Sequence, residues 1–222
     1  MKKYVIIVAG GTGKRFNSDL PKQYIPVCGK PLIIHTIEAF TKPLPELDII
    51  IVINPKMRKQ CESILAAFAV SNCTLADGGP ERFHSVKNGL AKIADEDSLV
   101  AIHDAVRPFV STEVILTAFK DADYYGNAVP VVNINESVRI RKGALNEPVD
   151  RAFLYKVQTP QCFKTGLIKN AYRQNFDEKF TDDAIVLEST GERIHLIDGN
   201  VENIKITYHS DLLVAEALLK KV

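Results

Sequence analysis

The sequence predicts an α/β fold in which a mostly parallel sheet lies between two layers of helices. Along the 222 residues, short β-branched runs alternate with segments whose apolar residues recur at helical spacing. This alternation predicts one domain over 1–222. It is interrupted once, by a polar stretch at 133–150 that predicts a β-hairpin arm leaving the sheet. The predicted fold is therefore a Rossmann-like three-layer sandwich with a protruding arm.

Composition excludes several classes of protein. Lys and Arg number 28 and Asp and Glu 27, so the formal charge of +1 lacks the basic excess of a nucleic-acid binder. No apolar run approaches the ~20 residues that span a bilayer, and the N-terminus has no signal-peptide pattern. The four cysteines lack metal-ligand spacing, which favours reduced thiols in a cytoplasmic protein. We expect neither nucleic acid nor membrane as a partner.

The first predicted element is a strand over 4–9 that stops at a glycine-rich turn. Glycines allow the backbone to approach a ligand closely and to direct its N–H groups inward. Positive charge follows at once, on Lys14, Arg15 and Lys22. Three cationic residues within nine positions favour a phosphate site, with a nucleotide triphosphate as the expected ligand, over a plain turn with solvated lysines.

Two better-known phosphate loops do not fit this turn. A Walker loop requires glycine where Val8 stands and a hydroxyl where Arg15 stands. A dinucleotide fingerprint requires a third glycine where Phe16 stands, which argues against a nicotinamide oxidoreductase. The turn is therefore predicted to be a different kind of nucleotide loop.

The alternation continues through the middle of the chain. Helical spacing covers 32–40, 61–68 and 83–93, while short apolar runs at 49–53, 74–76, 99–102 and 128–132 predict strands. The strand at 99–102 leads into Asp104 and Arg107. Ligands of open α/β sheets bind at the carboxyl ends of strands, so these two residues are candidates for binding. They can equally pair with each other and fix the turn, and spacing alone does not separate the two possibilities.

The remaining elements follow the arm. Alternation at 137–141 with a turn at Lys142-Gly143 favours a hairpin over a disordered loop. A strand is predicted at 155–158, then a helix over 164–176 and a second helix capped by Thr181 that ends before Gly191. Short strands at 194–197 and 203–207 precede a last helix capped by Ser210.

Motifs along the whole chain carry a family resemblance. They are Ala9–Arg15, Pro21–Tyr24, Gly78–Arg82 with Ser85-Val86, His103–Pro108, Asp150-Arg151, Thr159–Gln161, Thr181–Asp183 and Asn203–Thr207. In this order they resemble the 2-C-methyl-D-erythritol 4-phosphate cytidylyltransferases, the CTP-using enzymes of the non-mevalonate isoprenoid pathway. Ribitol-5-phosphate cytidylyltransferases share the opening loop and 103–108. Arg82 with Ser85-Val86 and Gly89-Leu90, and 149–151 followed by Leu154, favour the erythritol enzymes. Ser137 replaces a usual threonine, and Pro80 stands where some members have an acid.

The resemblance implies transfer of a cytidylyl group from CTP to methylerythritol phosphate, with Mg²⁺ or another divalent cation and no protein metal ligand that we can name. A non-catalytic nucleotide scaffold or sensor is the alternative, but the cationic residues are retained. Catalysis is implied for Arg15, Lys22 and Lys205. Nucleotide binding is implied for Ala9, Gly10, Gly11, Gly13, Gly79 and Ser85. Substrate binding is implied for Asp104, Arg107, Ser137, Arg151 and Thr159.

The arm predicts a homodimer. An isolated two-stranded hairpin is marginally stable in water, so a second subunit is expected to hold 133–150. Family resemblance adds that such arms interlock. Ser137 and Arg151 are then expected to serve the active site of the other subunit.

Overall fold

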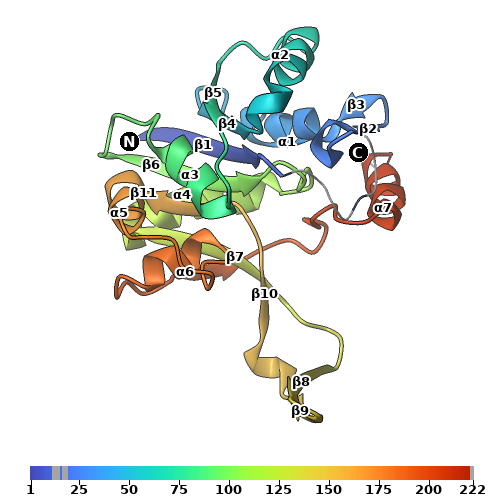
Figure 1. The fold of residues 1–222 in the computed structure, drawn as a ribbon, viewed down its shortest axis with the longest axis vertical. Helices are drawn as coiled ribbons and strands as arrows, with labels where there is room; N and C mark the ends of the chain where they lie inside the picture. The colour runs from blue at the N-terminus through green and yellow to red at the C-terminus, as the bar shows by residue number, and fades with distance from the viewer. Residues whose placement is uncertain (12–15, 17–19, 221–222) are drawn as a thin grey trace.

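The structure is a computed structural model that describes residues 1–11, 16 and 20–220. Its central sheet has the strand order β10-β7-β11-β6-β1-β4-β5, with β12 paired to β7 (Figure 1). The strands are β1 (Lys2–Ala9), β4 (Asp48–Ile53), β5 (Cys73–Asp77), β6 (Ser98–Asp104), β7 (Asn127–Asn133), β10 (Tyr155–Val157), β11 (Gln161–Lys164) and β12 (Leu196–Asp198).

Most of the sheet is parallel, as predicted. Strand β1 pairs in parallel with β4 on one side and with β6 on the other, and β5 continues the parallel order beyond β4. The register places Val8 opposite Asp104. The turn after β1 and the turn after β6 therefore emerge side by side at the carboxyl edge, where ligands of such sheets bind.

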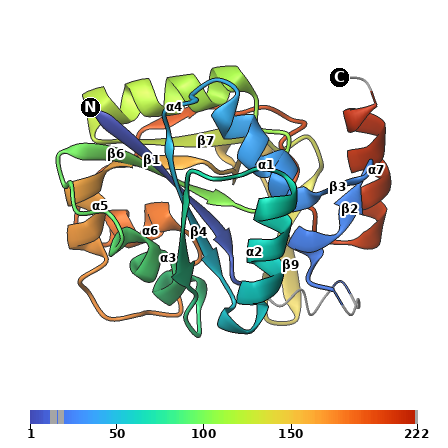
Figure 2. The same ribbon diagram turned by 90° about the horizontal axis from the view of Figure 1, so that it is seen from above.

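Helices cover both faces, which confirms the three layers (Figure 2). Val5 and Ile7 of β1 pack under α1 (Leu32–Thr41), α2 (Arg58–Ala67) and α4 (Thr112–Tyr125). Tyr4 and Ile6 point the other way, under α3 (Arg82–Leu90), α5 (Thr165–Ala171) and α6 (Asp183–Glu188). Successive strand residues face opposite sides, so a continuous apolar run is what a strand covered on both faces requires.

A third cluster closes one end of the molecule. Phe16, Val106, Ile206 and Ala215 pack together there, with help from the short hairpin of β2 (Pro26–Val27) and β3 (Lys30–Pro31). Ala215 belongs to the last helix, α7 (His209–Leu219), which lies beside this hairpin in both views (Figures 1 and 2). The first and last parts of the chain thus meet near the carboxyl edge of β1.

The arm is the tip of one long hairpin. Strands β8 (Val138–Lys142) and β9 (Leu145–Val149) form a two-stranded sheet of their own, joined through Gly143, whose φ is +62°. The legs of the hairpin are β7 and the returning strands β10 and β11, which run antiparallel to β7. The predicted hairpin is confirmed, and it stands away from the body of the molecule (Figure 1).

The strand β11 was not predicted. It lies between β6 and β7 and runs antiparallel to both. Lys164 is the last residue of β11, not the first of a helix. The helix predicted at 164–176 is therefore shorter than predicted, and α5 spans Thr165–Ala171. The strand is four residues long, and its apolar residues are only Cys162 and Phe163. Such a short segment carries too little periodicity to identify it.

Other predictions near the C-terminus were wrong in detail. The segment 203–207 is not a strand: its backbone contact with the turn after β6 is one hydrogen bond, from Ile206 N to Val106 O at 3.0 Å. Asp182 rather than Thr181 caps α6, because its Oδ1 accepts the N–H of Ile185 at 3.0 Å. At α7, Asp211 Oδ2 accepts two backbone N–H groups, from Thr207 and Tyr208, so Ser210 is not the cap. In the described part of the chain, no helix combines the length and apolar character of a bilayer span.

Candidate active site

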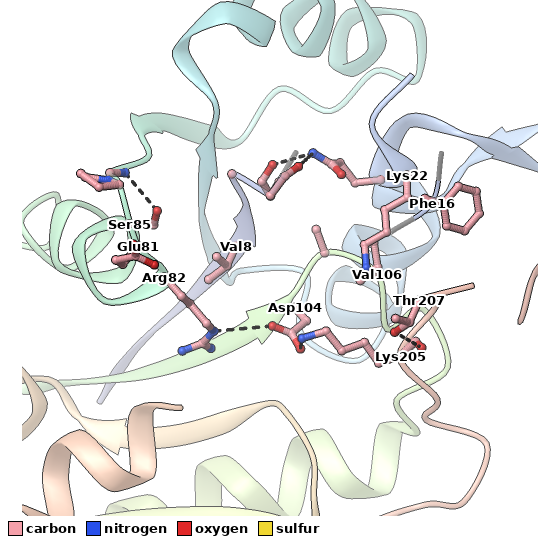
Figure 3. A pocket seen from close by; sticks show the side chains of 17 residues that line it. Val8, Phe16, Lys22, Glu81, Arg82, Ser85, Asp104, Val106, Lys205 and Thr207 are labelled. Carbon is pink, nitrogen blue, oxygen red and sulfur yellow. Dashed lines mark hydrogen bonds and ion pairs between the residues drawn. The ribbon is translucent and has the colours of Figure 1, made fainter. Parts of the chain in front are cut away.

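A cavity of about 420 Å³ opens where β1 and β6 end (Figure 3). Three parts of the chain that are far apart in sequence meet around it: the turn after β1, the turn before α3 and the segment before α7. Most residues of the predicted site line it, namely Ala9, Gly10, Gly11, Lys22, Gly79, Ser85, Asp104 and Lys205. The cavity has one end walled by small residues and another lined by charged side chains.

At the first end, Gln23 fixes the turn after β1. Its Nε2 donates to Ala9 O at 2.7 Å and to Gly11 O at 3.2 Å. The side chain is buried, and these bonds satisfy the donors of its amide group. Gln23 therefore holds the glycine turn open toward the cavity, a role that sequence reasoning did not assign to it.

Opposite this turn, Gly79 and Ser85 form a close-packed wall. Gly79 N donates to Ser85 Oγ at 3.0 Å. A Cβ placed on Gly79 would lie 2.3 Å from the Cβ of His84, so only glycine fits at this position. Gly10 faces the same serine, since a Cβ built there would lie 3.5 Å from Ser85 Oγ. Gly10, Gly79 and Ser85 therefore present backbone and small side chains to the cavity, a surface that a flat ring can approach closely.

At the charged end, Asp104 gathers three cations. Its Oδ2 lies 2.8 Å from Lys205 Nζ and 3.3 Å from Arg107 Nε, and its Oδ1 lies 3.8 Å from Arg82 Nε. Burial disfavours the carboxylate, but Lys205, Arg82 and Arg107 outweigh this effect and hold the pKa of Asp104 well below its usual range. Asp104 is therefore ionised at neutral pH.

Lys22 and Lys205 both line the cavity, Lys22 from the turn that follows the glycine loop and Lys205 from the segment before α7 (Figure 3). Lys22 begins the 3₁₀ turn Lys22–Tyr24, and its Nζ donates to Ile206 O at 2.9 Å, next to Lys205 in the chain. The Lys205 side chain is 41% exposed, so its ammonium group is accessible to an incoming anion. Two lysines from opposite ends of the sequence thus line the same cavity.

Arg107 and Thr159 lie behind Asp104 and do not line the cavity. Arg107 Nη1 donates to Asn203 O at 2.8 Å. Thr159 Oγ1 accepts the N–H of Asp104 at 3.2 Å and lies 3.0 Å from His103 Nδ1. Both side chains are engaged with the protein itself, which is the arrangement expected of residues that fix the position of Asp104.

His103 completes this support. Its Nε2 lies 3.0 Å from Arg107 O, an acceptor, so Nε2 carries the proton and Nδ1 accepts from the Thr159 hydroxyl. Burial lowers the pKa of His103 to about 4, which keeps the ring neutral at physiological pH. The histidine is thus a fixed structural link rather than a proton donor to the cavity.

The other predicted site residues fall into two groups. Gly13 and Arg15 lie outside the described residues, so their roles stay predictions. Ser137 and Arg151 are exposed on the arm, where the Arg151 guanidinium donates to Asn135 O. Within this chain, the structure therefore does not join the arm residues to Lys22 and Lys205.

The structure also adds residues that sequence reasoning did not assign to the site. Phe16, Pro80, Glu81, Arg82 and Thr207 line the cavity together with Gln23. Arg82 shows best why sequence reasoning missed such residues, because its partner Asp183 lies 101 positions later in the chain. Both belong to motifs quoted above, but no local pattern indicates that they pair.

Comparisons with known proteins agree with the geometry. A family model described as "IspD: 2-C-methyl-D-erythritol 4-phosphate cytidylyltransferase" matches residues 3–221. A protein named 2-C-methyl-D-erythritol 4-phosphate cytidylyltransferase from Bacteroides thetaiotaomicron is 48% identical over 223 residues, covering 99% of this chain and 100% of the relative. One from Geobacillus kaustophilus is 38% identical, covering 99% of this chain and 97% of the relative.

Solved structures show the same fold. The 4-diphosphocytidyl-2C-methyl-D-erythritol synthase of Anaerococcus prevotii superimposes with a TM-score of 0.85 at 27% identity, covering 99% of this chain and 96% of that one. The cytidylyltransferase of Thermus thermophilus gives a TM-score of 0.79 at 28% identity, with 99% and 100% covered. The match of the family model over nearly the whole chain and the high identity to full-length relatives show that this chain belongs to the 2-C-methyl-D-erythritol 4-phosphate cytidylyltransferase family.

Proposed function

We propose that the protein transfers a cytidylyl group from CTP to 2-C-methyl-D-erythritol 4-phosphate, giving 4-diphosphocytidyl-2-C-methyl-D-erythritol and pyrophosphate. The observation that supports this proposal is a cavity with one end walled by backbone and small side chains and another end lined by two lysines. The first end suits a pyrimidine ring and the second suits a chain of phosphates. Membership of the family supplies the identity of the two substrates.

In the proposed reaction, a phosphate oxygen of methylerythritol phosphate attacks the α-phosphorus of CTP. A new P–O bond forms, the bond to the β-phosphate oxygen breaks, and pyrophosphate leaves with the electron pair. The second pKa of a phosphate monoester is about 6, so the nucleophile is already anionic at neutral pH and needs no general base. Catalysis then depends on positioning and on stabilising negative charge.

The charged end supports this role. Lys22 and Lys205 line it, and Asp104 holds the Lys205 ammonium at 2.8 Å. We assign both lysines to the charge that develops around the α-phosphorus. Arg15, outside the described residues, is proposed to act with them on the triphosphate.

The narrow end is proposed to bind cytosine. Ala9, Gly10 and Gly11 form one side and Gly79 and Ser85 the other. Gly13, outside the described residues, is proposed to contribute backbone to the same loop. We propose that this wall of small residues accepts a pyrimidine ring and excludes a larger purine. Pro80 also lines this end, and its ring offers no acidic group to contact the base.

Methylerythritol phosphate is proposed to bind beside Asp104, which lines the cavity. Arg107 and Thr159 contribute by holding Asp104, through the contacts described above. Ser137 and Arg151 are proposed to bind the phosphate group of methylerythritol phosphate in the active site of a second subunit. This assignment requires a homodimer in which the arms exchange.

The surface of the arm supports that dimer. Large apolar side chains are exposed on the arm and at its base: Ile140, Leu145, Phe153, Tyr155 and Val157. An exposed apolar surface of this kind marks an interaction site, and a two-stranded hairpin needs a partner to be stable. We therefore propose one domain over 1–222, with 133–150 as a dimerisation arm.

A divalent cation, Mg²⁺ or another, is proposed to enter with the nucleotide. Among the described residues, no group of three or more His, Cys, Asp or Glu side chains could hold a metal ion. Asp104, the acid at the charged end, is already shared by three cations. We propose that the ion is held mainly by phosphate oxygens and arrives with the nucleotide.

The remaining proposals concern compartment and partners. The four cysteines are free, which suits the reducing conditions of the cytoplasm. The near-neutral formal charge gives no basis for nucleic-acid binding, and we propose a cytoplasmic enzyme that acts on small molecules without membrane association.

One assay tests the function. Purified protein is incubated with CTP, Mg²⁺ and methylerythritol phosphate, and released pyrophosphate is measured, with ribitol 5-phosphate in a parallel reaction. We expect release with methylerythritol phosphate and little with ribitol 5-phosphate. The reverse preference would identify a ribitol-5-phosphate cytidylyltransferase. Binding of CTP without pyrophosphate release from either substrate would instead indicate a nucleotide scaffold.

A further inference from the structure

An ion pair at the charged end joins Arg82, which lines the cavity, to Asp183, which is buried. Arg82, on the first turn of α3, donates from Nη1 to Asp183 Oδ1 at 2.8 Å and from Nη2 to Asp183 Oδ2 at 2.6 Å. Asp183, on the first turn of α6, has no exposed side-chain surface. Tyr172 Oη also donates to Asp183 Oδ1, at 2.6 Å. Both oxygens of this carboxylate are therefore occupied and their direction is fixed.

Arg82 has a second carboxylate within reach. Its Nε lies 3.8 Å from Oδ1 of Asp104, whereas Lys205 and Arg107 contact Oδ2 of the same side chain. A guanidinium group forms its strongest bonds through pairs of parallel N–H groups. Asp183 takes the two terminal nitrogens, and so Arg82 approaches Asp104 only with Nε and only at a long distance.

We propose that Asp183 is a positioning residue for the reaction: by holding both terminal nitrogens of Arg82, it keeps Arg82 from displacing Lys205 on Asp104. This inference rests on the proposed role of Lys205. Without the Asp183 carboxylate, the two terminal nitrogens of Arg82, whose side chain is 25% exposed, would lose their anionic partner. Arg82 could then bind Asp104 instead. A bidentate ion pair between the Arg82 guanidinium and Asp104 would compete with the Lys205 ammonium for the carboxylate oxygens.

The first experiment measures kcat and the KM for CTP in four proteins: the unmodified enzyme, two single variants and their combination. Asp183→Asn should lower kcat about tenfold, because Arg82 would then bind Asp104 and Lys205 would lose Asp104 as its fixed partner. Lys205→Ala should lower kcat at least as much. Adding Asp183→Asn to Lys205→Ala should change kcat by less than about twofold, since the lysine through which Asp183 acts is already gone.

A second variant separates positioning from a merely structural role. Arg82→Gln combined with Asp183→Asn removes the competing guanidinium group and leaves no buried charge of this pair without its partner, so the double variant should fold even if Asp183→Asn alone does not. We expect kcat of the double variant to be at least about threefold above that of Asp183→Asn. If the single variant does not fold, adding Lys205→Ala to the double variant should still lower kcat about tenfold, because Asp104 then still holds Lys205.

Asp182→Asn is the matched control. It removes a carboxylate one position earlier, at the cap of the same helix. Asparagine can still cap α6 through Oδ1, while the bond that Oδ2 accepts from Gln161 Nε2 at 3.0 Å is lost, so the variant disturbs the packing of α6 without touching Arg82. Its kcat should stay within about twofold of the unmodified enzyme.

The outcomes are distinct. If the double variant is as inactive as Asp183→Asn, or if Asp183→Asn lowers kcat further in the Lys205→Ala background, the positioning role is wrong. An equal loss in Asp182→Asn would point to α6 packing and would also refute it. If Lys205→Ala retains full kcat, the proposed role of Lys205 fails instead, which is a separate result.

Discussion

Replacing Asp104 by asparagine tests the electrostatic arrangement at the end of β6. The carboxylate is 10% exposed and faces three cations at 2.8, 3.3 and 3.8 Å. The amide would keep the shape and part of the hydrogen bonding but would leave Lys205, Arg107 and Arg82 without this shared anion. Arg82 retains Asp183, and Lys205 can turn to solvent, so the loss is largest for Arg107.

The expected destabilisation by Asp104→Asn follows from how deeply each ion pair is buried. The Lys205 pair is partly exposed and contributes about 1 kcal/mol or less. Breaking a buried pair costs about 3–5 kcal/mol, and Arg107 is 13% exposed. Because the neutral amide is cheaper to bury than the carboxylate, we expect a net loss of about 3 kcal/mol in the free energy of unfolding. For a chain of this length that corresponds to a decrease in Tm of about 6–12 °C.

The loss should depend on pH in a defined direction. The pKa of Asp104 lies below its usual value in the folded state, so its stabilising effect is complete above the unfolded pKa of about 3.9. The effect is lost only as pH falls through the lower folded pKa. The stability difference between the unmodified protein and Asp104→Asn should therefore be constant from about pH 5 to 8 and shrink below about pH 4.

Urea unfolding followed by far-UV circular dichroism is the appropriate assay, because the chain has no tryptophan. Protein concentration must be held fixed if the protein dimerises. A variant as stable as the unmodified protein at pH 7 would refute the role of Asp104 as the shared anion. A difference that grows on acidification below about pH 4 would contradict the sign of the pKa shift.

Four further outcomes are expected. Lys22→Ala should lower kcat by ~10²-fold or more with little change in the KM for CTP, and a change in KM alone would contradict its role in the transition state. Gly79→Ala should raise the KM for CTP or destabilise the fold by about 1–3 kcal/mol, measured by kinetics and urea unfolding, since its Cβ would lie 2.3 Å from that of His84. Among nucleotides, pyrophosphate release should be fastest with CTP, slower with UTP and slowest with ATP or GTP; comparable rates with ATP would refute the narrow pocket. Co-expression of Lys22→Ala with Arg151→Ala should restore activity that each homodimer lacks, because one site of the heterodimer is intact; failure to restore it, or a monomer by light scattering, would argue against exchanged arms.

Sequence alone predicted the parts of the fold that depend on local pattern. The β-branched runs of β1 and β4 identify central strands because they are covered on both faces. The glycine turn and Lys22 identified the cavity, since close backbone approach and positive charge are local properties. The arm was predicted because its alternation and turn lie within one short continuous stretch, 133–150.

What was missed depends on contacts between distant segments. The alternating residues of 203–207 are typical of a strand, yet the segment pairs with none of the described strands and contacts Val106 through one backbone bond. The substrate role of Thr159 stays a prediction, but the contacts of its hydroxyl with Asp104 N and His103 Nδ1 could not be foreseen from the sequence. The partner of Arg82 lies 101 positions away, and no spacing rule could have indicated it.

The short strand β11 has a consequence for how the protein opens. Among the described strands, β6 and β7 do not pair with each other. The sheet therefore has two groups of paired strands, which we call ladders here: β5-β4-β1-β6, and β7 with β10 and β12. In this part of the chain the two ladders join along β11, from Gln161 opposite Ile102 to Lys164 opposite Leu99. This seam is the natural boundary between two blocks of amide protection. It runs beneath the cavity, because Asp104 lies on one side and Thr159, which accepts its N–H, on the other. We expect an opening that separates the two groups of strands to break this hydrogen bond and so to release the backbone of Asp104.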